Sequence, residues 1–373
     1  MATSRKTNGN GGATPLDLDV LTTALADAGA PWEMAYTPMT ALEESERRIR
    51  LGVPPKPELP DDDEDAAAAA RAASADIVGA PAMFDVRNVG GISYDTSVKD
   101  QGGCGSCVAF GVAAAMEIVF RYTRRTQTPV DLSEAHLFYV HARSEGRNCS
   151  NGWWPDRALT HAKATGVTFE DYFPYTAGNQ DGSALNGDWR NRLAKATGFE
   201  NVSGNALKMK EAISTYGAVT ACFNVYQDFF SYRSGVYSHV SGSLAGGHCV
   251  VLIGYDDAAG CWIARNSWGA GWGDGGYFRI AYGQCGIESY QTCTVQGVTM
   301  RAWLPNQTVA GLWSNEHDGN VWAYGAQRGW LKLDGGDAVT NHAMLSELAA
   351  SKALSRPVGM FEDNGSVQQI YAW

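Results

Sequence analysis

Apolar residues near the N-terminus recur with the spacing of an amphipathic helix. This spacing predicts a helix over residues 15–28, ended by glycine and proline at positions 29 and 31, and its apolar members are Leu18, Leu21, Leu25 and Ala28. A second helix is predicted over residues 40–49, where charges of alternating sign leave only a thin apolar face made by Leu42 and Ile49. Such a helix needs a partner surface.

Residues 54–76 have no apolar face. Prolines crowd residues 54–60, an acidic run follows at residues 61–65, and an alanine-rich stretch leads to Asp76. This composition is typical of a solvated tether, so we place a domain boundary there. The acidic run lacks the alternating ligands and the glycine of a calcium loop, which favours the tether.

The central block has the mixed pattern of an α+β domain. An alanine-rich helical pattern follows Cys107, and strand-like runs separated by Gly and Asp turns lie at residues 249–255, 261–265 and 276–281. We therefore divide the chain into an N-terminal segment with an acidic linker (1–79), an α+β domain (80–299) and a small β-rich C-terminal module (300–373).

The C-terminal module shows a weak internal repeat. Strands are predicted at residues 321–324 and 367–373, each preceded by an Asp/Asn-Gly turn, and Met344, Leu345, Leu348 and Leu354 mark a short helix between them. Five tryptophans could form a sugar-stacking face or a site for a protein ligand, although tryptophans in a small β module are more often core; they are Trp303, Trp313, Trp322, Trp330 and Trp373.

Composition and charge exclude several classes of partner. The chain has 373 residues, 45% of them hydrophobic, and a formal net charge of −11, with no dense Lys/Arg stripe. It should therefore repel phosphate backbones and anionic membranes, which makes nucleic acid an unfavourable partner. No apolar run approaches the ~20 residues of a membrane-spanning helix, and the polar start does not resemble a signal peptide. We expect a soluble protein, with the compartment left open between secreted, periplasmic and cytoplasmic.

The strongest chemical signal is a cysteine at the start of the long helix. Cys107 ends the run Gln101-Gly-Gly-Cys-Gly-Ser-Cys, and the unpaired N–H groups and dipole of a helix N-terminus stabilise a thiolate. His248, just ahead of a predicted strand, is the candidate base, and Asn266 is the candidate for orienting its imidazole. The side-chain amide of Gln101 and the backbone N–H of Cys107 could donate to the oxyanion of a tetrahedral intermediate.

With these residues in this order, the chain resembles the papain family of cysteine peptidases from about residue 81 to residue 290. Further segments agree in order, namely residues 84–87, 131–134, 166–175, 266–273 and 285–289. The resemblance implies a helical left domain and a β-barrel-like right domain facing each other across a cleft. Its implied activity is cleavage of protein or peptide substrates through a thioester acyl-enzyme, with no cofactor and no metal.

The resemblance also implies substrate contacts. The pocket for the second residue before the cut would be lined by Trp154, Pro155, Cys249 and Tyr290. Trp268 would shield the hydrogen bond between Asn266 and His248 from water, and Gly152 would contact the substrate backbone, although its stretch is one residue out of register with the family. Val108 replaces a tryptophan usual in the family, which removes no reacting group.

The cysteines outside the site are assigned in the same way. Cys104 and Cys149 fall on the positions of a family disulfide. Cys285 and Cys293 could pair with each other, whereas the apolar surroundings of Cys222, Cys249 and Cys261 predict buried free thiols.

The N-terminal segment resembles the inhibitory prosegments of the family in position, and its shortness resembles that of some bacterial members. We expect part of residues 14–60 to lie along the cleft in the non-productive direction and to make the enzyme latent. Two rival hypotheses are a binding protein built on an inactive peptidase fold and a transamidase or ligase that uses the same acyl-enzyme.

Overall fold

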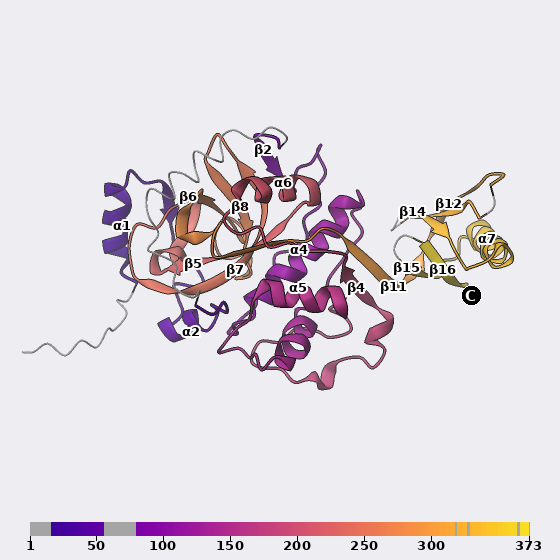
Figure 1. Ribbon diagram of the computed structural model, residues 1–373, viewed down its shortest axis with the longest axis horizontal. Coiled ribbons are helices and arrows are strands. Elements are labelled where there is room, and N and C mark those ends of the chain that lie inside the picture. The colour runs from indigo at the N-terminus through magenta and orange to yellow at the C-terminus, as the bar shows by residue number, and fades with distance from the viewer. Residues whose placement is uncertain (1–15, 56–79, 318, 327–328, 364–365, 373) are drawn as a thin grey trace, which may run out of the picture.

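The computed structural model describes residues 16–55, 80–317, 319–326, 329–363 and 366–372. Residues 56–76 of the predicted tether, with the acidic run at residues 61–65, lie outside these ranges, as do the turn residues Asp318, Asn364 and Gly365, and Trp373. A helical lobe and a β-rich lobe pack together, and the C-terminal module projects from one end (Figure 1). The predicted α+β class with two facing domains is confirmed.

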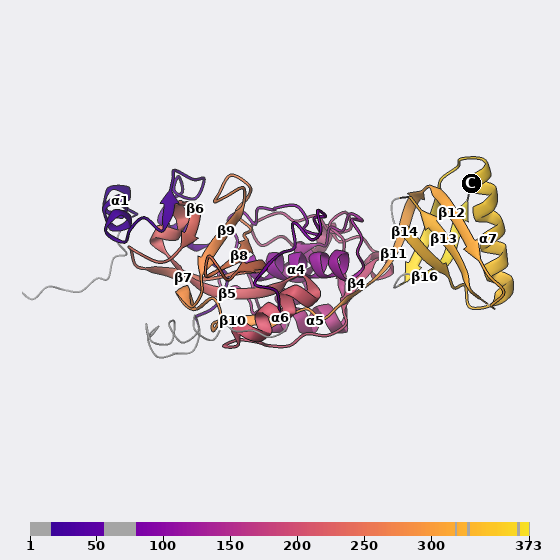
Figure 2. The ribbon, with the colours of Figure 1, turned by 90° about the horizontal axis from the view of Figure 1, so that it is seen from above.

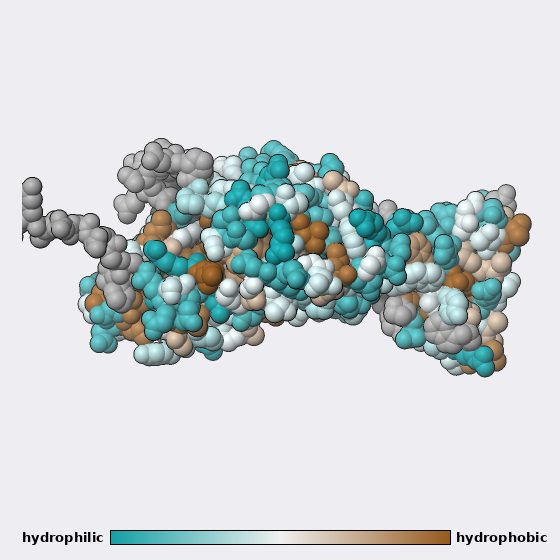
Figure 3. All heavy atoms as spheres, turned by 90° about the horizontal axis from the view of Figure 1, so that it is seen from below, coloured by the Kyte–Doolittle hydropathy of each residue, from teal (hydrophilic) through white to brown (hydrophobic). Residues whose placement is uncertain are grey.

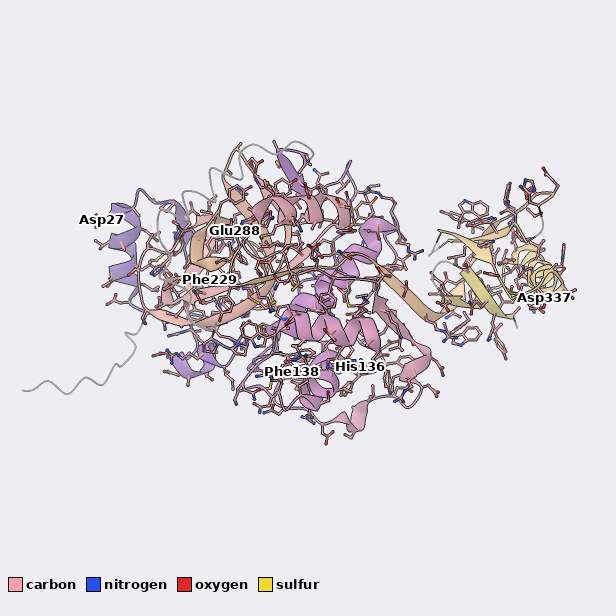
Figure 4. All side chains as sticks on the ribbon, viewed as in Figure 1. Asp27, His136, Phe138, Phe229, Glu288 and Asp337 are labelled. Atoms are coloured by element: carbon pink, nitrogen blue, oxygen red, sulfur yellow. A yellow bond between two sulfur atoms is a disulfide. The ribbon has the colours of Figure 1, made fainter. Side chains whose placement is uncertain are left out.

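The helical lobe is built around one buried helix. α4 (Cys107–Thr123) begins at Cys107, and nearly all of its residues are buried. A helix that is apolar on every face must be surrounded by protein. It is enclosed by α6 (Ala206–Tyr216), by α5 (Pro155–Ala164) and by the π-helix η1 (His136–Ala142). Figure 4 shows His136 and Phe138 in this lobe. Short elements complete it: η2 (Gly182–Ala184), η3 (Trp189–Asn191), β3 (Val167–Thr168) and β4 (Leu193–Ala196).

The β-rich lobe is one open sheet rather than a closed barrel. Its strand order is β1-β6-β9-β8-β7-β5-β10, with β2 added on β7. The strands are β1 (Trp32–Met34), β2 (Met83–Asp85), β5 (Val219–Tyr226), β6 (Tyr232–Tyr237), β7 (Leu244–Asp256), β8 (Cys261–Arg265), β9 (Tyr277–Ala281) and β10 (Gln291–Thr294). Two 3₁₀ helices, η4 (Gln227–Ser231) and η5 (Gln284–Gly286), join them.

An aromatic core fills the β-rich lobe. Phe229, labelled in Figure 4, lies with its ring centroid 4.9 Å from that of Trp272 and 5.7 Å from that of Trp268. Aromatic side chains bury large areas each, so this cluster dominates the packing beside the cleft. The predicted strands agree with β8 and β9, but β7 begins at Leu244, so His248 lies inside a strand and not ahead of it.

The N-terminal segment belongs structurally to the β-rich lobe. α1 (Leu18–Asp27) is capped by the Asp17 carboxylate, and β1 pairs antiparallel with β6. Trp32 is buried between Tyr232 and Tyr237. The second predicted helix shortens to α2 (Glu44–Arg48), whose partner surface includes Phe230 beneath the Arg47 guanidinium.

A single strand connects the peptidase region to the C-terminal module. β11 (Val298–Gln307) pairs with β4 at one end and with β15 (Val358–Asp363) at the other, so the boundary proposed at residue 300 falls within a continuous strand. The remaining strands are β12 (Val309–Ser314), β13 (Val321–Gly325), β14 (Gly329–Leu333) and β16 (Ser366–Ala372). α7 (Ala338–Ala353) packs on the outer face of this sheet, away from the peptidase lobes (Figure 2).

The expectation that the module's tryptophans are core is wrong for three of them. Trp303, Trp313 and Trp330 are 37%, 47% and 50% exposed. The module core is aliphatic, because Val321, Ala323, Leu331 and Leu333 already fill the space beneath α7. In the space-filling view the module forms a separate lobe beyond a narrow waist (Figure 3).

A buried ion pair supports the base of the cleft. Arg265, the last residue of β8, donates from Nη1 to Asp95 Oδ1 over 2.6 Å, and the two side chains are only 5% and 4% exposed. Tyr277 donates its hydroxyl to the second Asp95 oxygen over 2.8 Å. Because Arg265 directly precedes Asn266, this pair fixes the backbone that carries Asn266.

Replacing Asp95 with alanine should therefore strongly destabilise the peptidase lobes. The change leaves the Arg265 charge buried without its partner, and breaking a buried pair in this way typically costs about 3–5 kcal/mol of unfolding free energy. Chemical denaturation followed by tryptophan fluorescence measures the loss. Lys208→Ala, which removes the exposed pair with Glu200, is the matched control and should cost far less than Asp95→Ala. Equal losses would contradict the assigned role of the buried pair.

Candidate active site

Cys107 lies at the first position of α4 and is fully buried. The preceding loop is held by a disulfide between Cys104 and Cys149, which confirms the predicted bridge, and by a hydrogen bond from Gly105 N to Cys149 O over 3.0 Å. The hydroxyl groups of Ser106 and Tyr175 are hydrogen-bonded beneath this turn, with Oγ and Oη 2.7 Å apart. The thiol is therefore placed by a rigid loop at a helix N-terminus.

His248 lies on the opposite wall, in β7 of the β-rich lobe. Its Nε2 is 2.8 Å from Asn266 Oδ1, and its ring centroid is 4.7 Å from that of Trp268, which is 2% exposed. The structure thus brings together the predicted base, the predicted orienting amide and the predicted shielding tryptophan.

Gln101 is buried and its side-chain amide is fixed at both ends. Its Oε1 accepts a hydrogen bond from Ser267 Oγ over 2.7 Å, and its Nε2 donates to Cys104 O over 2.8 Å and to Arg50 O over 2.9 Å. Ser267 was missed in the sequence analysis, although it stands in the same Asn-Ser-Trp run as Asn266. Its hydroxyl orients the Gln101 amide so that Nε2 faces both the Cys104 carbonyl of the loop and the Arg50 carbonyl of the N-terminal segment.

The N-terminal segment crosses the cleft at residues 50–54, here called the covering segment. Trp153 N donates to Gly52 O over 2.9 Å on the helical wall, and Val53 N donates to Gly247 O over 3.1 Å on the β-rich wall. Tyr290 Oη donates to Pro54 O over 2.7 Å. The covering segment is therefore bound to both walls, and the prediction that part of residues 14–60 occupies the cleft is confirmed.

Close backbone approach explains why glycines line this crossing. A Cβ on Gly52 would lie 2.0 Å from Gly105 O, and a Cβ on Gly152 would lie 1.9 Å from Gly52 O. Gly152 also has a φ of +59°, which side chains disfavour. The sequence analysis missed Gly52 because nothing in the local pattern tells which glycine will meet a distant backbone.

The covered site holds both reacting groups in their neutral forms. Burial raises the pKa of the Cys107 thiol to about 12, helped by the neighbouring Cys249 and partly offset by the backbone of Cys249, Gly52 and Val108. Burial lowers the pKa of His248 to about 4, partly offset by Asn266 and the Arg50 carbonyl. Water excluded by the covering segment would otherwise solvate the thiolate and the imidazolium.

We expect labelling of Cys107 by iodoacetamide to report this state. Because burial raises the pKa of this thiol to about 12, the thiolate is scarce at pH 7 and its share increases as pH rises. The full-length chain should therefore react faster as pH rises, whereas a form starting at Ala80 should react readily at neutral pH. Peptide mapping by mass spectrometry gives both rates. Identical pH profiles would show that the covering segment does not perturb the thiol.

The residues predicted to line the substrate pocket lie near the covering segment. The rings of Trp154 and Tyr290 have centroids 6.1 Å apart, and Pro155 begins α5 immediately after Trp154. Cys249 is buried, with Sγ 3.0 Å from the position that a Cβ on Gly111 would take in α4. Val53, 5% exposed, belongs to the same apolar cluster as Cys249 and Tyr290.

The pairing of Cys285 with Cys293, which the sequence left open, is not formed in the structure. Neither is in a disulfide, because Cys285 lies in the aromatic core of the β-rich lobe while Cys293 lies in β10, in the core shared with α4. Cys222, Cys249 and Cys261 are buried free thiols as expected. Within the described residues, no group of three His, Cys, Asp or Glu side chains is arranged to hold a metal, and no helix is long and apolar enough to cross a membrane.

A buried cysteine at a helix N-terminus, opposite a histidine held by an asparagine across a two-lobed cleft, defines a papain-like cysteine peptidase. A family profile described as "Papain family cysteine protease" matches residues 80–295. The chain belongs to this family.

Individual relatives agree with this assignment. A Cathepsin B-like CP2 of Giardia intestinalis is 36% identical over 202 residues, which cover 51% of this chain and 66% of that protein. A gut-specific cysteine proteinase of Caenorhabditis elegans is 34% identical over 248 residues, covering 59% of this chain and 75% of that protein. Among solved structures, proCathepsin B S9 from Trypanosoma congolense has a TM-score of 0.61 at 21% identity, covering 76% of this chain and 99% of that chain. This last likeness shows the fold.

Proposed function

We propose that the chain is a latent cysteine endopeptidase whose catalytic residues are Cys107, His248, Asn266 and Gln101. The Cys107 thiolate attacks the peptide carbonyl, and the His248 imidazolium protonates the leaving amine. Asn266 holds the imidazole orientation, and Gln101 Nε2 with Cys107 N–H donates to the oxyanion. Water assisted by His248 then hydrolyses the thioester.

The observation that carries this proposal is the position of the Arg50 carbonyl. It accepts a hydrogen bond from Gln101 Nε2, the group assigned to the oxyanion of the substrate. A substrate carbonyl and the covering segment compete for the same donor. That a carbonyl of the chain itself occupies this donor supports the assignment of Gln101 to the oxyanion site. It also supports latency, because the occupied donor is closed to a substrate.

The direction of the covering segment supports latency rather than self-cleavage. Arg50 lies at Gln101, and the residues that follow it, Val53 and Pro54, lie at Gly247 and Tyr290. In a productive substrate, the residue at the Tyr290 pocket precedes the scissile carbonyl in sequence. The covering segment therefore runs opposite to a productive substrate.

The proposal is tested by hydrolysis of a fluorogenic peptide by the full-length chain and by a form starting at Ala80, each beside its Cys107→Ala version. Activity of the shorter form alone, abolished by Cys107→Ala, is the expected result. Circular dichroism checks the fold of the shorter form, because it loses β1. Failure of both folded forms to turn over any peptide or to react with an epoxide inhibitor would favour a binding protein on an inactive fold.

We also expect a preference for bulky apolar or aromatic residues at the second position before the cut. The aromatic and apolar lining by Trp154, Pro155, Cys249 and Tyr290 offers no carboxylate to an arginine. A positional peptide library, cleaved by the active form, measures this preference. Best cleavage with arginine at that position would refute the assigned pocket.

A further inference from the structure

The C-terminal module presents an aromatic face that its own core does not use. Trp313 pairs with Trp322, Trp322 with Lys332, and Tyr324 with Trp330 across β12, β13 and β14. Directly opposed residues of antiparallel strands share one face of the sheet, and so do residues two apart on one strand. All five side chains therefore lie on the sheet face opposite α7. The residues that alternate with them along β13 and β14 belong to the core beneath α7.

This aromatic face forms a shallow, open depression. A pocket of about 570 Å³ is lined by Trp313, Asn320, Trp322 and Trp330. Trp322 is held in place because its Nε1 donates to Asn320 Oδ1 over 2.7 Å, and the Trp330 ring packs edge-on against Tyr324 at 5.4 Å. The rings are thus fixed before any ligand arrives, which lowers the entropic cost of binding.

A second, basic pocket of about 920 Å³ continues from the aromatic one. Its lining includes Trp322 and Trp330 of the module, Lys332 of β14, and Arg124 and Arg125 at the end of α4. None of the described residues that line it is acidic, although the chain as a whole carries a net charge of −11. The Arg125 guanidinium is stacked over Tyr122 at 4.2 Å. The peptidase lobe and the module therefore form one basic and aromatic cleft between them.

We propose that this cleft binds an anionic polysaccharide, a chain of pyranose rings that carry carboxylates. A pyranose ring presents flat C–H faces that stack on tryptophan, while its hydroxyls and carboxylates project from the ring edge toward Asn320 and the cations. The two tryptophans shared by both pockets allow one linear ligand to use the rings and the charges together. The aromatic side chains stand on a face of the sheet, whereas a peptide strand pairs only along a sheet edge, so a ligand bound over these rings gains no strand pairing from them.

The interaction would anchor the peptidase on acidic glycans. It is independent of the catalytic proposal, because the face lies outside the cleft that holds Cys107. Its test is isothermal titration calorimetry of the full-length Cys107→Ala protein with polygalacturonic acid, with a neutral cello-oligosaccharide and with polyglutamate as comparison probes. We expect polygalacturonic acid to bind most tightly, and its affinity to fall as salt is raised from about 50 to 200 mM.

Variants separate the two halves of the cleft. Trp330→Ala and Arg125→Gln should each weaken binding of polygalacturonic acid by about tenfold or more, since each removes one stacked ring or one charged contact. Trp303→Ala removes an exposed tryptophan that packs on Phe361, outside both pockets, and should leave the affinity unchanged. Thermal unfolding checks that every variant is folded.

Three results would overturn the proposal. One is the absence of measurable polygalacturonate binding by the folded protein. Another is equal binding of the neutral oligosaccharide with no effect of Arg125→Gln, which would remove the role of charge. The third is tighter binding of polyglutamate, which would identify an acidic peptide as the ligand class.

Discussion

Replacing Gly52 with valine will convert the full-length chain from a latent to an active peptidase. The new Cβ would lie 2.0 Å from Gly105 O and 2.3 Å from Gly105 C, backbone atoms of the disulfide-held loop that cannot move aside. The covering segment must then leave the cleft and lose its hydrogen bonds to Gln101, Trp153, Gly247 and Tyr290. At about 1 kcal/mol for each of these four bonds, the loss is about 4 kcal/mol, which raises the fraction of molecules with an open active site by roughly 10³-fold.

The measurement is the initial rate of fluorogenic peptide hydrolysis by the intact chain, with gels to exclude cleavage during the assay. Tyr36→Ala, in the same N-terminal segment but 84% exposed, is the matched control and should leave the chain latent. An inactive Gly52→Val protein beside an active form that starts at Ala80 would show that latency does not depend on this crossing.

In the Gly52→Val background, His248→Ala will lower kcat/KM by about four orders of magnitude or more. In the proposed mechanism His248 activates the thiol and protonates the leaving amine, so its loss removes a group that acts in both steps and leaves little rate enhancement beyond substrate binding. Asn266→Ala should cost less, about 10²-fold, because the imidazole remains but loses the 2.8 Å contact that orients it.

His342→Ala provides the matched control for the loss of a histidine. His342 is an exposed residue of α7, with Nδ1 2.8 Å from Ala338 O, and its removal should change kcat/KM by less than about twofold. Binding of an uncharged peptide aldehyde to His248→Ala checks that this variant still has a folded active site. The aldehyde bonds to the Cys107 thiol, which the variant retains. Retention of full activity by His248→Ala would remove His248 from the mechanism.

Latency in this protein has an electrostatic part as well as a steric one. The covering segment occupies the Gln101 donor, and by excluding water it also keeps Cys107 and His248 neutral. Displacement of the segment therefore frees the substrate path and allows the thiolate and imidazolium to form together. A short stretch of backbone with Gly52 at its centre can therefore inhibit peptide cleavage without a long inhibitory domain.

Local patterns in the sequence were sufficient for several elements. The helix α4 and the strands β8 and β9 were predicted because periodicity and turn residues are properties of adjacent positions. The catalytic candidates were found because their residue types and order carry the chemistry. The module strands β12, β14 and β15 were missed, since short runs interrupted by glycine and charge have no clear period of two.

The sequence by itself thus determined the class of fold and supplied the candidates for the reacting residues, because both depend on residue type and order along the chain, and the family resemblance in the sequence implied the bridge between Cys104 and Cys149. Only the tertiary structure decided that Gly52 meets Gly105, that Cys285 and Cys293 lie in separate cores, and that the aromatic face of the module meets Arg124 and Arg125. These are contacts between segments far apart in sequence, and their existence depends on how whole lobes pack, which no local pattern of residues encodes.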